Sequence, residues 1–376
     1  MIKVLNIISD TNVGGAGRVI LNYLKYRDAD GFDVSVALPR GSALIERIEP
    51  FGVKVIEVDG IADKSLDFAA IKELKQVIKA ENPDIVHTHG SMSGRIAARQ
   101  CRKKVIYTRH SAFPVKSYMS RGPGMWLNKL INEHYADRII AVSPACADNL
   151  TEGGISKNKI DIVMNGVEPV TPPAPEETAA FRNSLGLGEN DFTAGILARI
   201  EDYKGHMDIL RAVSLLRDRG TDIKLIIAGT GSYENEVKFA AKSFGLEDQV
   251  IFLGFVNDVA KVLDAIDVQL NASYGTEATS LSLLEGFSMG VPAVVSDYGG
   301  NPWLVENGVN GLIFPTRDYT AMADALSRLA KEPDTLREMG LAAKKTYEDS
   351  FTGERFARRT EEIYTAVMEA KKHGKR

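Results

Sequence analysis

Short apolar segments of strand length alternate with amphipathic helical patterns along most of this chain, and this alternation constrains its fold more than any other feature. In the first half, the predicted strands are residues 4–8, 34–38, 53–58, 85–87, 105–108 and 138–142. Helical patterns lie between several of them, at 19–25, 68–79 and 127–135. Strands separated by helices favour a mostly parallel sheet with helices on both faces.

The alternation breaks at residues 168–177, whose sequence EPVTPPAPEE is rich in proline and predicts a linker. A second series follows, with predicted strands at 193–197, 225–228, 250–253, 268–271, 293–296 and 312–314. We therefore predict two doubly wound α/β domains, residues 1–170 and 171–352, and a last helix at 353–376 that crosses back onto the first domain. Ligands of such sheets bind beyond the carboxyl ends of the strands, so a cleft between the two domains is the expected site.

The composition is that of an ordinary globular enzyme, with 44% hydrophobic and 26% charged residues. The net charge of −4 gives no overall basis for binding nucleic acid. Cys101 and Cys146 are the only cysteines and form no metal-like spacing, which fits a reducing cytoplasm. The apolar N-terminus is too short for a secretory signal, and no apolar run reaches the length of a membrane span. The expected location is therefore the cytoplasm.

The segment from Tyr274 to Pro315 carries the strongest chemical signal. Its carboxylates Glu277 and Glu285 flank a predicted helix that starts at Thr279-Ser280-Leu281 and ends at Gly290. Free backbone N–H groups at a helix N-terminus bind phosphate, and neighbouring carboxylates accept hydrogen bonds from sugar hydroxyls. The segment therefore predicts a pocket for a sugar joined to phosphate.

Two cations, Arg199 and Lys204, follow the predicted strand 193–197 in the sequence LARIEDYKGH. They could neutralise a diphosphate leaving group, or they could be solvated loop cations. The nearby phosphate-binding pattern favours the first interpretation. The loop at 229–232, GTGS, follows another strand and either lines the same site or only turns the chain.

Gly14-Gly15-Ala16-Gly17 separates the first strand from the first helix, where glycine allows close approach to a phosphate or sugar. The run does not match GxGxxG, because Ile20 stands at the third glycine, so a dinucleotide-binding dehydrogenase is disfavoured.

Three histidines lie at or just after the ends of predicted strands. His110 should lie at the edge of the expected cleft. His87 and His89 form an HxH pair, which indicates either metal binding or packing and hydrogen bonding at the strand end, and we favour the second. The acidic pair at Asp28 and Asp30 lies on the opposite side from the strand ends and predicts an exposed turn. We therefore expect no metal and no cofactor.

A long stretch between Asp84 and Glu133 contains no acidic residue. It holds nine cations, with Phe113, Tyr118 and Trp126 among them: Arg95, Arg99, Arg102, Lys103, Lys104, Arg109, Lys116, Arg121 and Lys129. One interpretation is a face that contacts an anionic membrane or a lipid-diphosphate acceptor. The other is a solvated basic face whose partners lie elsewhere in the fold.

Together, the pair Glu277-x7-Glu285, the segment ARIEDYKGH, the loop GGAGR and the run SDYGGNPWLVENGVNGLIFP resemble the retaining glycosyltransferases of family 4, also called group 1. The resemblance covers nearly the whole chain and is strongest from Gly195 to Pro315. The chain departs from the family where Ala278-Thr279-Ser280 replaces Gly-Phe-Gly, where Gly17 replaces glutamate, and where Ala198 replaces glycine.

The resemblance implies the GT-B fold, with two Rossmann-like domains facing across a cleft. An N-terminal domain on the acceptor side would then face a C-terminal domain that binds the donor. It implies that Arg199 and Lys204 hold the donor diphosphate, together with backbone N–H groups near Thr279, Ser280 and Leu281. It also implies that Glu277 contacts the transferred sugar, Glu285 the donor ribose, Gly15 the donor phosphates and His110 the reacting sugar.

The function expected from this resemblance is metal-independent transfer of a hexose, with retention, from a nucleoside-diphosphate sugar to a hydroxyl of a glycan or lipid-linked acceptor. Uridine is favoured over guanosine as the base, and polysaccharide biosynthesis is the expected role. Two alternatives stay open. A sugar-nucleotide epimerase would convert a donor without any acceptor, and a non-catalytic sugar-nucleotide-binding subunit would release no nucleoside diphosphate.

Overall fold

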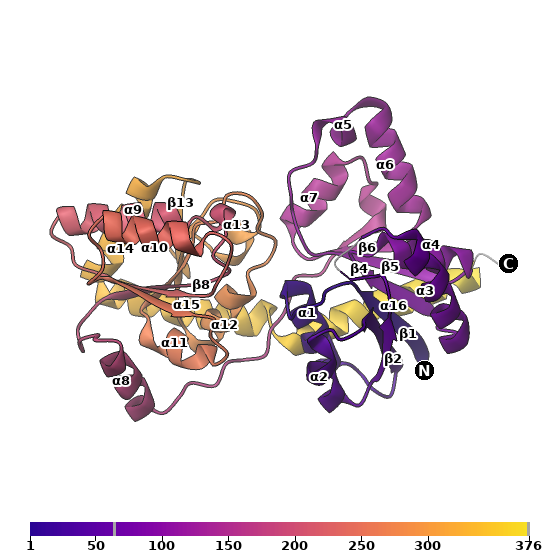
Figure 1. The fold of residues 1–376 in the computed structure, drawn as a ribbon, viewed down its shortest axis with the longest axis horizontal. Coiled ribbons are helices and arrows are strands. Elements are labelled where there is room, and N and C mark those ends of the chain that lie inside the picture. The colour runs from indigo at the N-terminus through magenta and orange to yellow at the C-terminus, as the bar shows by residue number, and fades with distance from the viewer. Residues whose placement is uncertain (63–64, 374–376) are drawn as a thin grey trace. The chain divides into compact units, whose positions relative to one another are not determined.

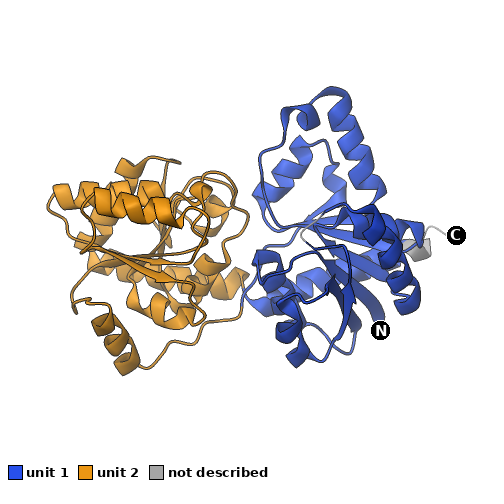
Figure 2. Ribbon diagram, in the orientation of Figure 1, with its two compact units in different colours: residues 1–167, 352–376 blue, residues 168–351 orange. Residues whose placement is uncertain are grey.

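A computed structural model describes residues 1–62 and 65–373 as two compact units (Figure 2). Unit 1 combines Met1–Val167 with the chain from Thr352 onward, and unit 2 is Glu168–Phe351. The division after Val167 lies three residues before the boundary predicted from the sequence. Residues 374–376 of the predicted last helix lie outside the described residues.

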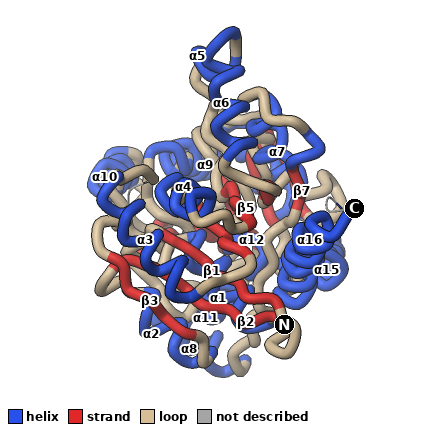
Figure 3. Tube along the Cα trace, turned by 90° about the vertical axis from the view of Figure 1, so that its right-hand side faces the viewer, coloured by secondary structure: helices blue, strands red, loops and turns tan. Residues whose placement is uncertain are grey.

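Unit 1 is built on a parallel sheet in which the described strands follow the order β3-β2-β1-β4-β5-β6-β7 (Figure 3). Their bounds are β1 Ile2–Ile8, β2 Phe32–Pro39, β3 Lys54–Val58, β4 Ile85–His89, β5 Lys104–Arg109, β6 Arg138–Ala141 and β7 Ile160–Ile162. The order reverses between β1 and β4, as in a doubly wound sheet. Sequence patterning found all of these strands except the short edge strand β7.

Helices cover both faces of this sheet. Their bounds are α1 Gly15–Tyr26, α2 Leu44–Ile48, η1 Glu49–Phe51, α3 Phe68–Glu81, α4 Met92–Gln100, α5 Ser117–Ser120, α6 Gly122–His134, α7 Pro144–Glu152, η2 Lys157–Lys159 and α16 Gly353–His373. The last helix, α16, packs along α1 and buries Tyr364 against Tyr23 and Phe32 (Figure 1). It therefore completes the core of unit 1, although the whole of unit 2 separates it from α7 along the chain.

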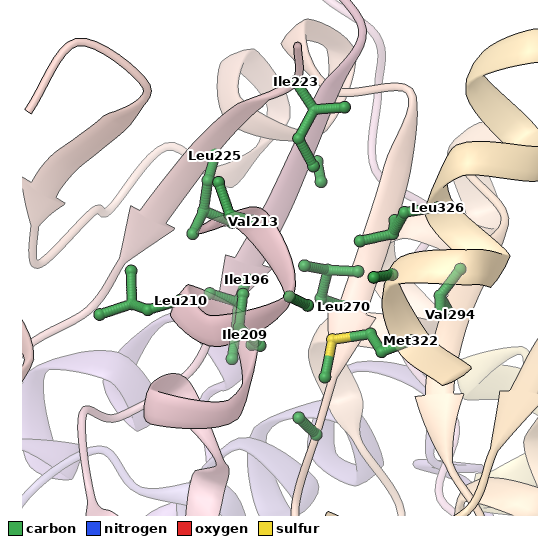
Figure 4. Close-up of a cluster of buried hydrophobic side chains, with 14 of the residues drawn as sticks. Ile196, Ile209, Leu210, Val213, Ile223, Leu225, Leu270, Val294, Met322 and Leu326 are labelled. Carbon is green, nitrogen blue, oxygen red and sulfur yellow. The ribbon is translucent and has the colours of Figure 1, made fainter. Parts of the chain in front are cut away.

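Unit 2 repeats the architecture, with its described parallel strands in the order β10-β9-β8-β11-β12-β13. The bounds are β8 Thr193–Leu197, β9 Lys224–Ala228, β10 Val250–Gly254, β11 Val268–Asn271, β12 Ala293–Ser296 and β13 Gly311–Phe314. Side chains from β8, β9 and β11 meet α9 and α14 in the cluster of Figure 4, which includes Ile196, Leu210, Leu225, Leu270 and Met322. Two parallel sheets covered by helices confirm the predicted fold class.

The helices of unit 2 are α8 Pro175–Ser184, η3 Asp202–Lys204, α9 His206–Asp218, α10 Glu234–Ser243, α11 Val259–Ala265, α12 Leu281–Met289, α13 Asn301–Leu304, α14 Tyr319–Lys331 and α15 Pro333–Ser350. The prediction that residues 168–177 form only a linker is wrong for the last three residues, 175–177, which are helical. Pro175 opens α8, and Glu176 and Glu177 lie in its first turn. Proline suits the first helical position, where no N–H is required, and acids are favourable at that end of the helix dipole.

Candidate functional site

The predicted phosphate-binding helix is present in unit 2 as α12, which starts at Leu281 and ends before Gly290. Ser280 caps it, because its Oγ accepts a hydrogen bond of 3.4 Å from the N–H of Leu283. Thr279 and Ser280 are buried, and Leu281 is half-buried. The first N–H groups of a helix have no partner within it, so this end can receive an anion.

Glu277 precedes this helix and is the centre of a buried polar cluster. Its Oε2 accepts three hydrogen bonds: from Lys204 Nζ at 2.8 Å, from Asn271 Nδ2 at 3.0 Å and from Ser273 Oγ at 2.9 Å. The side chains of Lys204 and Glu277 are only 18% and 7% exposed, so their ion pair is largely shielded from water. Polar groups at the carboxyl end of β11 and from η3 thus hold one carboxylate in a fixed position.

The protonation state of Glu277 follows from two opposing effects. Burial raises the pKa of the Glu277 carboxyl group. The positive charge of Lys204 and the hydrogen bonds from Lys204, Asn271 and Ser273 lower this pKa by more than burial raises it. The net result is a pKa below the usual glutamate value. Glu277 is therefore a carboxylate at neutral pH, suited to accept hydrogen bonds from hydroxyl groups and unsuited to act as a general acid.

Arg199 follows β8, as predicted, and differs from Lys204 in its surroundings. Its guanidinium is exposed, and Nη2 donates to the hydroxyl of Tyr203 at 3.2 Å. Lys204 instead stands at the end of η3 and reaches the buried carboxylate. The two cations therefore combine one accessible planar charge with one fixed charge on the same loop.

Two glycine loops hold these segments through close backbone contacts. A Cβ at Gly229 would lie 1.9 Å from the carbonyl oxygen of Ala198, so the GTGS loop packs directly on the backbone beside Arg199. A Cβ at Gly300 would lie 1.5 Å from the carbonyl oxygen of Ala278, and the N–H of Gly300 donates to Glu277 O at 2.9 Å. Only glycine permits such approach, so both loops support the shape of the candidate site.

Glu285 lies on α12, half-buried, and its backbone carbonyl accepts a hydrogen bond of 2.6 Å from Ser288 Oγ. The carboxylates Glu277 and Glu285 thus occupy different environments. Glu277 belongs to the loop before α12 and is hydrogen-bonded within the polar cluster, whereas Glu285 belongs to the helix itself. Different roles for the two acids are consistent with this arrangement.

Unit 1 contains the other two predicted site residues. Gly15 opens α1, and a Cβ there would meet nothing within 4 Å, so the backbone at this point is uncovered within unit 1. His110 directly follows β5, where its Nε2 lies 2.8 Å from Nδ1 of His89. The two rings are stacked with centroids 5.1 Å apart. His89 Nε2 in turn lies 3.1 Å from Asn6 Oδ1.

The His87 ring lies beside that of His89, with centroids 4.4 Å apart, but its nitrogens have other partners. Its Nδ1 lies 2.7 Å from the hydroxyl of Tyr364 on α16, and its Nε2 lies 2.6 Å from Thr108 Oγ1. Within the described residues, no group of three or more histidines, cysteines and acids could hold a metal ion. The hydrogen bonds of His87 and His89 are those expected of histidines that pack at the end of a strand. The turn at Asp28 and Asp30 is also as predicted, since Asp28 Oδ1 accepts the N–H of Asp30 and is exposed.

Sequence reasoning missed four residues of these clusters: Asn271, Ser273, His89 as the partner of His110, and Asn6. A usable signal existed for each, because every one stands in or just after the carboxyl-terminal half of a parallel strand, where ligands bind.

Comparison with known proteins assigns both units to one family. The family model described as Glycosyltransferase Family 4 matches residues 13–170, and the model described as Glycosyl transferases group 1 matches residues 177–346. The chain belongs to the family 4, group 1 glycosyltransferases. The resemblance that the motifs predicted is thereby confirmed.

Relatives of this family 4 glycosyltransferase align over most of their length. EpsD of Bacillus subtilis (strain 168) is 28% identical over 93% of both chains. The UDP-Gal:alpha-D-GlcNAc-diphosphoundecaprenol alpha-1,3-galactosyltransferase of Escherichia coli is 26% identical over 88% of both chains. HepE of Anabaena in complex with UDP has 20% identity to this chain, a TM-score of 0.84, and coverage of 97% of this chain and 100% of its own. The same protein has also been solved with UDP-glucose. The last similarity shows the shared GT-B fold.

Proposed function

We propose that this glycosyltransferase moves a hexose from a UDP-sugar to a hydroxyl of a glycan or lipid-linked acceptor, with retention of anomeric configuration and without a metal ion. The observation that carries the proposal is the buried Lys204–Glu277 pair beside the N-terminus of α12. A cation and a carboxylate held together in this way suit the two halves of a sugar diphosphate. The UDP complexes of HepE and the UDP-galactose donor in the name of the E. coli relative support uridine.

The reaction breaks the bond between the anomeric carbon and the diphosphate and forms a bond from that carbon to the acceptor oxygen. We assign Arg199, Lys204 and the N–H groups near Thr279, Ser280 and Leu281 to the negative charge that develops on the leaving diphosphate. The acceptor attacks from the face that the diphosphate leaves, and its proton passes to the departing phosphate oxygen. These charges supply the stabilisation for which other enzymes use a metal ion, which is why we propose a metal-independent reaction.

The remaining residues position the donor. We assign Glu277 to a hydroxyl of the transferred sugar, because its lowered pKa keeps it an acceptor of hydrogen bonds. Glu285 is assigned to the ribose hydroxyls, Gly15 to the donor phosphates and His110 to the reacting sugar. A hydrolytic pair of acid and base is disfavoured, since such a pair needs one carboxyl group with a raised pKa.

The acceptor is proposed from the relatives. The E. coli galactosyltransferase has a name that specifies a sugar carried on diphosphoundecaprenol. A lipid-linked glycan acceptor of the same chemical class would place this enzyme in polysaccharide biosynthesis at the cytoplasmic face of a membrane. In the part of the chain that the structure describes, no helix has both the length and the apolarity needed to cross a membrane.

A panel of UDP- and GDP-sugars, incubated with and without lipid-linked acceptors, tests the proposal. We expect UDP release that depends on acceptor, and a product whose anomeric configuration, read by NMR coupling constants, matches the donor. Conversion of the donor sugar in the absence of acceptor would instead identify an epimerase. Binding of UDP with no turnover of any donor would identify a non-catalytic binding subunit. Activity that survives chelation by EDTA is expected, and its loss would overturn the metal-independent step.

A further inference from the structure

Helix α6 has the reverse of the usual polarity of a surface helix. An amphipathic helix normally turns its apolar side chains toward the core and its polar side chains toward water. In α6, all of whose residues are described, none is buried. Figures 1 and 3 both show α5 and α6 extending away from the sheet of unit 1.

The polar face of α6 makes the hydrogen bonds to the rest of unit 1, and Met125 is the apolar side chain that packs beside it, against Gly154. Asn128 Nδ2 donates to Gly153 O at 2.7 Å, and Asn132 Oδ1 accepts from Arg95 Nη1 at 2.9 Å. Glu133 accepts from the N–H of Ser156 at 2.9 Å, and within the helix it also accepts from Lys129 Nζ at 2.7 Å. These bonds fix the orientation of the helix with its polar side inward.

The outward face is therefore apolar. Trp126 is 60% exposed, and Leu127 and Leu130, on the same side of the helix, are also exposed. Phe113 and Tyr118, which precede α6, are exposed as well. Isolated exposed apolar residues are ordinary, but five of them within one projecting segment mark an interaction surface.

The charges of this region separate into two groups. Arg95 is buried against the ring of Tyr107, and Arg99 and Lys104 both form ion pairs with Asp137. Arg95, Arg99 and Lys104 therefore serve the fold, which the interpretation of the whole stretch as one basic face did not anticipate. Lys116 and Arg121, by contrast, are exposed beside the outward apolar residues.

We propose that the segment from Phe113 to Leu130 docks unit 1 onto the headgroup region of an anionic lipid bilayer. Trp126, Leu127 and Leu130 would enter the boundary between headgroups and acyl chains, and Lys116 and Arg121 would contact the anionic headgroups. The helix lies in the surface and does not cross it.

Several features favour a bilayer over a second protein chain. Tryptophan and tyrosine are enriched at membrane interfaces, where an apolar ring and a polar edge are both satisfied. The segment adds two exposed cations and no acid, which matches an anionic surface. A membrane-bound enzyme would meet the lipid-linked acceptor of the proposed function, and to that extent the docking surface rests on that function. The orientation of α6 supports the docking surface independently.

Flotation with vesicles tests the proposal without donor or acceptor, so its result is independent of the proposed reaction. We expect the full chain to float with phosphatidylcholine vesicles that contain phosphatidylglycerol, and to bind pure phosphatidylcholine vesicles much more weakly. The double variant Trp126→Ser, Leu130→Ser should bind at least tenfold more weakly, because two apolar side chains no longer leave water. Replacing Lys116 and Arg121 by Gln should weaken binding to the anionic vesicles about fivefold per cation.

Matched controls lie elsewhere on the chain. Phe239→Ser with Phe255→Ser removes two apolar side chains of unit 2 that are more exposed than Trp126 and Leu130. Arg102→Gln with Lys103→Gln removes two cations that precede the docking segment. Both should bind vesicles as the unaltered protein does. A second readout uses the only two tryptophans: in the variant Trp303→Phe, the fluorescence of Trp126 should shift to the blue and be quenched by brominated lipid.

Vesicle binding and Trp126 fluorescence can each contradict the proposed membrane contact. Absence of vesicle binding, or an unchanged Trp126 spectrum in bound protein, would overturn the proposal. Binding that persists in the Trp126, Leu130 variant, or that disappears only in the Arg102, Lys103 variant, would assign the membrane contact to another surface. If light scattering showed that the Trp126, Leu130 variant converts a dimer to a monomer, the face would be a contact between copies of the chain.

Discussion

His110 Nε2 lies 2.8 Å from Nδ1 of His89, and this contact determines which nitrogen of His110 can face a ligand. Asn6 Oδ1 can only accept a hydrogen bond, so His89 Nε2 carries the N–H that donates to it, and the Nδ1 of a neutral His89 must be an acceptor. His110 then donates from Nε2, and its own Nδ1 carries the free electron pair. Burial lowers the pKa of His110 to about 4 and that of His89 well below its usual value, so both rings are neutral at physiological pH.

The first prediction concerns this tautomer. Nitrogen-15 NMR of the labelled protein should show neutral His110 protonated at Nε2. Replacing His89 by Leu should lower kcat/KM about tenfold, because His110 loses the acceptor that orients it, while His89→Asn, whose side-chain oxygen can take the place of Nδ1, should retain more activity. Protonation of His110 at Nδ1, or equal activity of the Leu and Asn variants, would contradict the assignment.

The second prediction concerns the Lys204–Glu277 pair. Lys204→Ala should reduce transfer by roughly a hundredfold or more through loss of charge stabilisation. It should also lower the free energy of unfolding by about 3–5 kcal/mol, because Glu277 stays buried without its counter-charge. The double variant Lys204→Met, Glu277→Gln should regain much of the stability and none of the activity.

As a control, Lys238→Ala removes a lysine from the surface pair with Glu234 and should change stability by less than about 1 kcal/mol. Chemical denaturation and steady-state kinetics measure the two effects separately. Near-normal turnover in Lys204→Ala would remove Lys204 from the proposed phosphate contacts.

The third prediction concerns the loop that carries Glu277. Gly300→Ala would place a Cβ 1.5 Å from the carbonyl of Ala278, so the backbone between Glu277 and Thr279 must move. We expect UDP binding measured by calorimetry to weaken at least tenfold and the melting temperature to fall. Gly188→Ala is the matched control, since its Cβ would meet Asp191 at an ordinary 3.4 Å. Equal behaviour of the two variants would show that the Gly300 contact does not support the site.

The fourth prediction is an acid-dependent loss of stability in unit 1. Burial lowers the pKa of His87 to about 3 and that of His110 to about 4, whereas both would titrate near 6.5 in the unfolded chain. The unfolded state therefore binds protons first as pH falls. The neutral histidines contribute fully to the free energy of unfolding above pH 6.5. This contribution is lost progressively as the pH falls toward the pKa values of the folded state, and the loss is roughly 3 kcal/mol for His110 alone.

Hydrogen exchange at pH 7 and pH 5, corrected for intrinsic rates, measures this effect. Peptides from β4, β5 and α16 should lose protection together, because His87 joins β4 to Thr108 on β5 and to Tyr364 on α16. A variant with His87 replaced by Gln should be less stable at pH 7 but lose less stability on acidification. Protection that is unchanged at pH 5 would contradict the lowered pKa values.

Much of the fold could be predicted from local patterns. The start and end of α12 were predicted because a serine cap, apolar residues at helical spacing and a terminal glycine act on neighbouring residues only. Strand positions followed from buried apolar runs in the same way. The edge strand β7 was missed because, with Ile162 exposed, it lacks that signal.

The sequence by itself determined the fold class, the family and the residue types of the candidate site, since these depend on periodicity and short motifs. Only the tertiary structure decided which side chains meet: Asn271, Ser273 and Lys204 converge on one oxygen of Glu277, and His87 and His89 divide between Tyr364 and His110. It also decided that α6 turns its apolar face outward. Helical periodicity in the sequence indicates that a helix has a polar and an apolar face. Which face packs inward depends on the side chains and backbone groups that the rest of the fold places next to the helix.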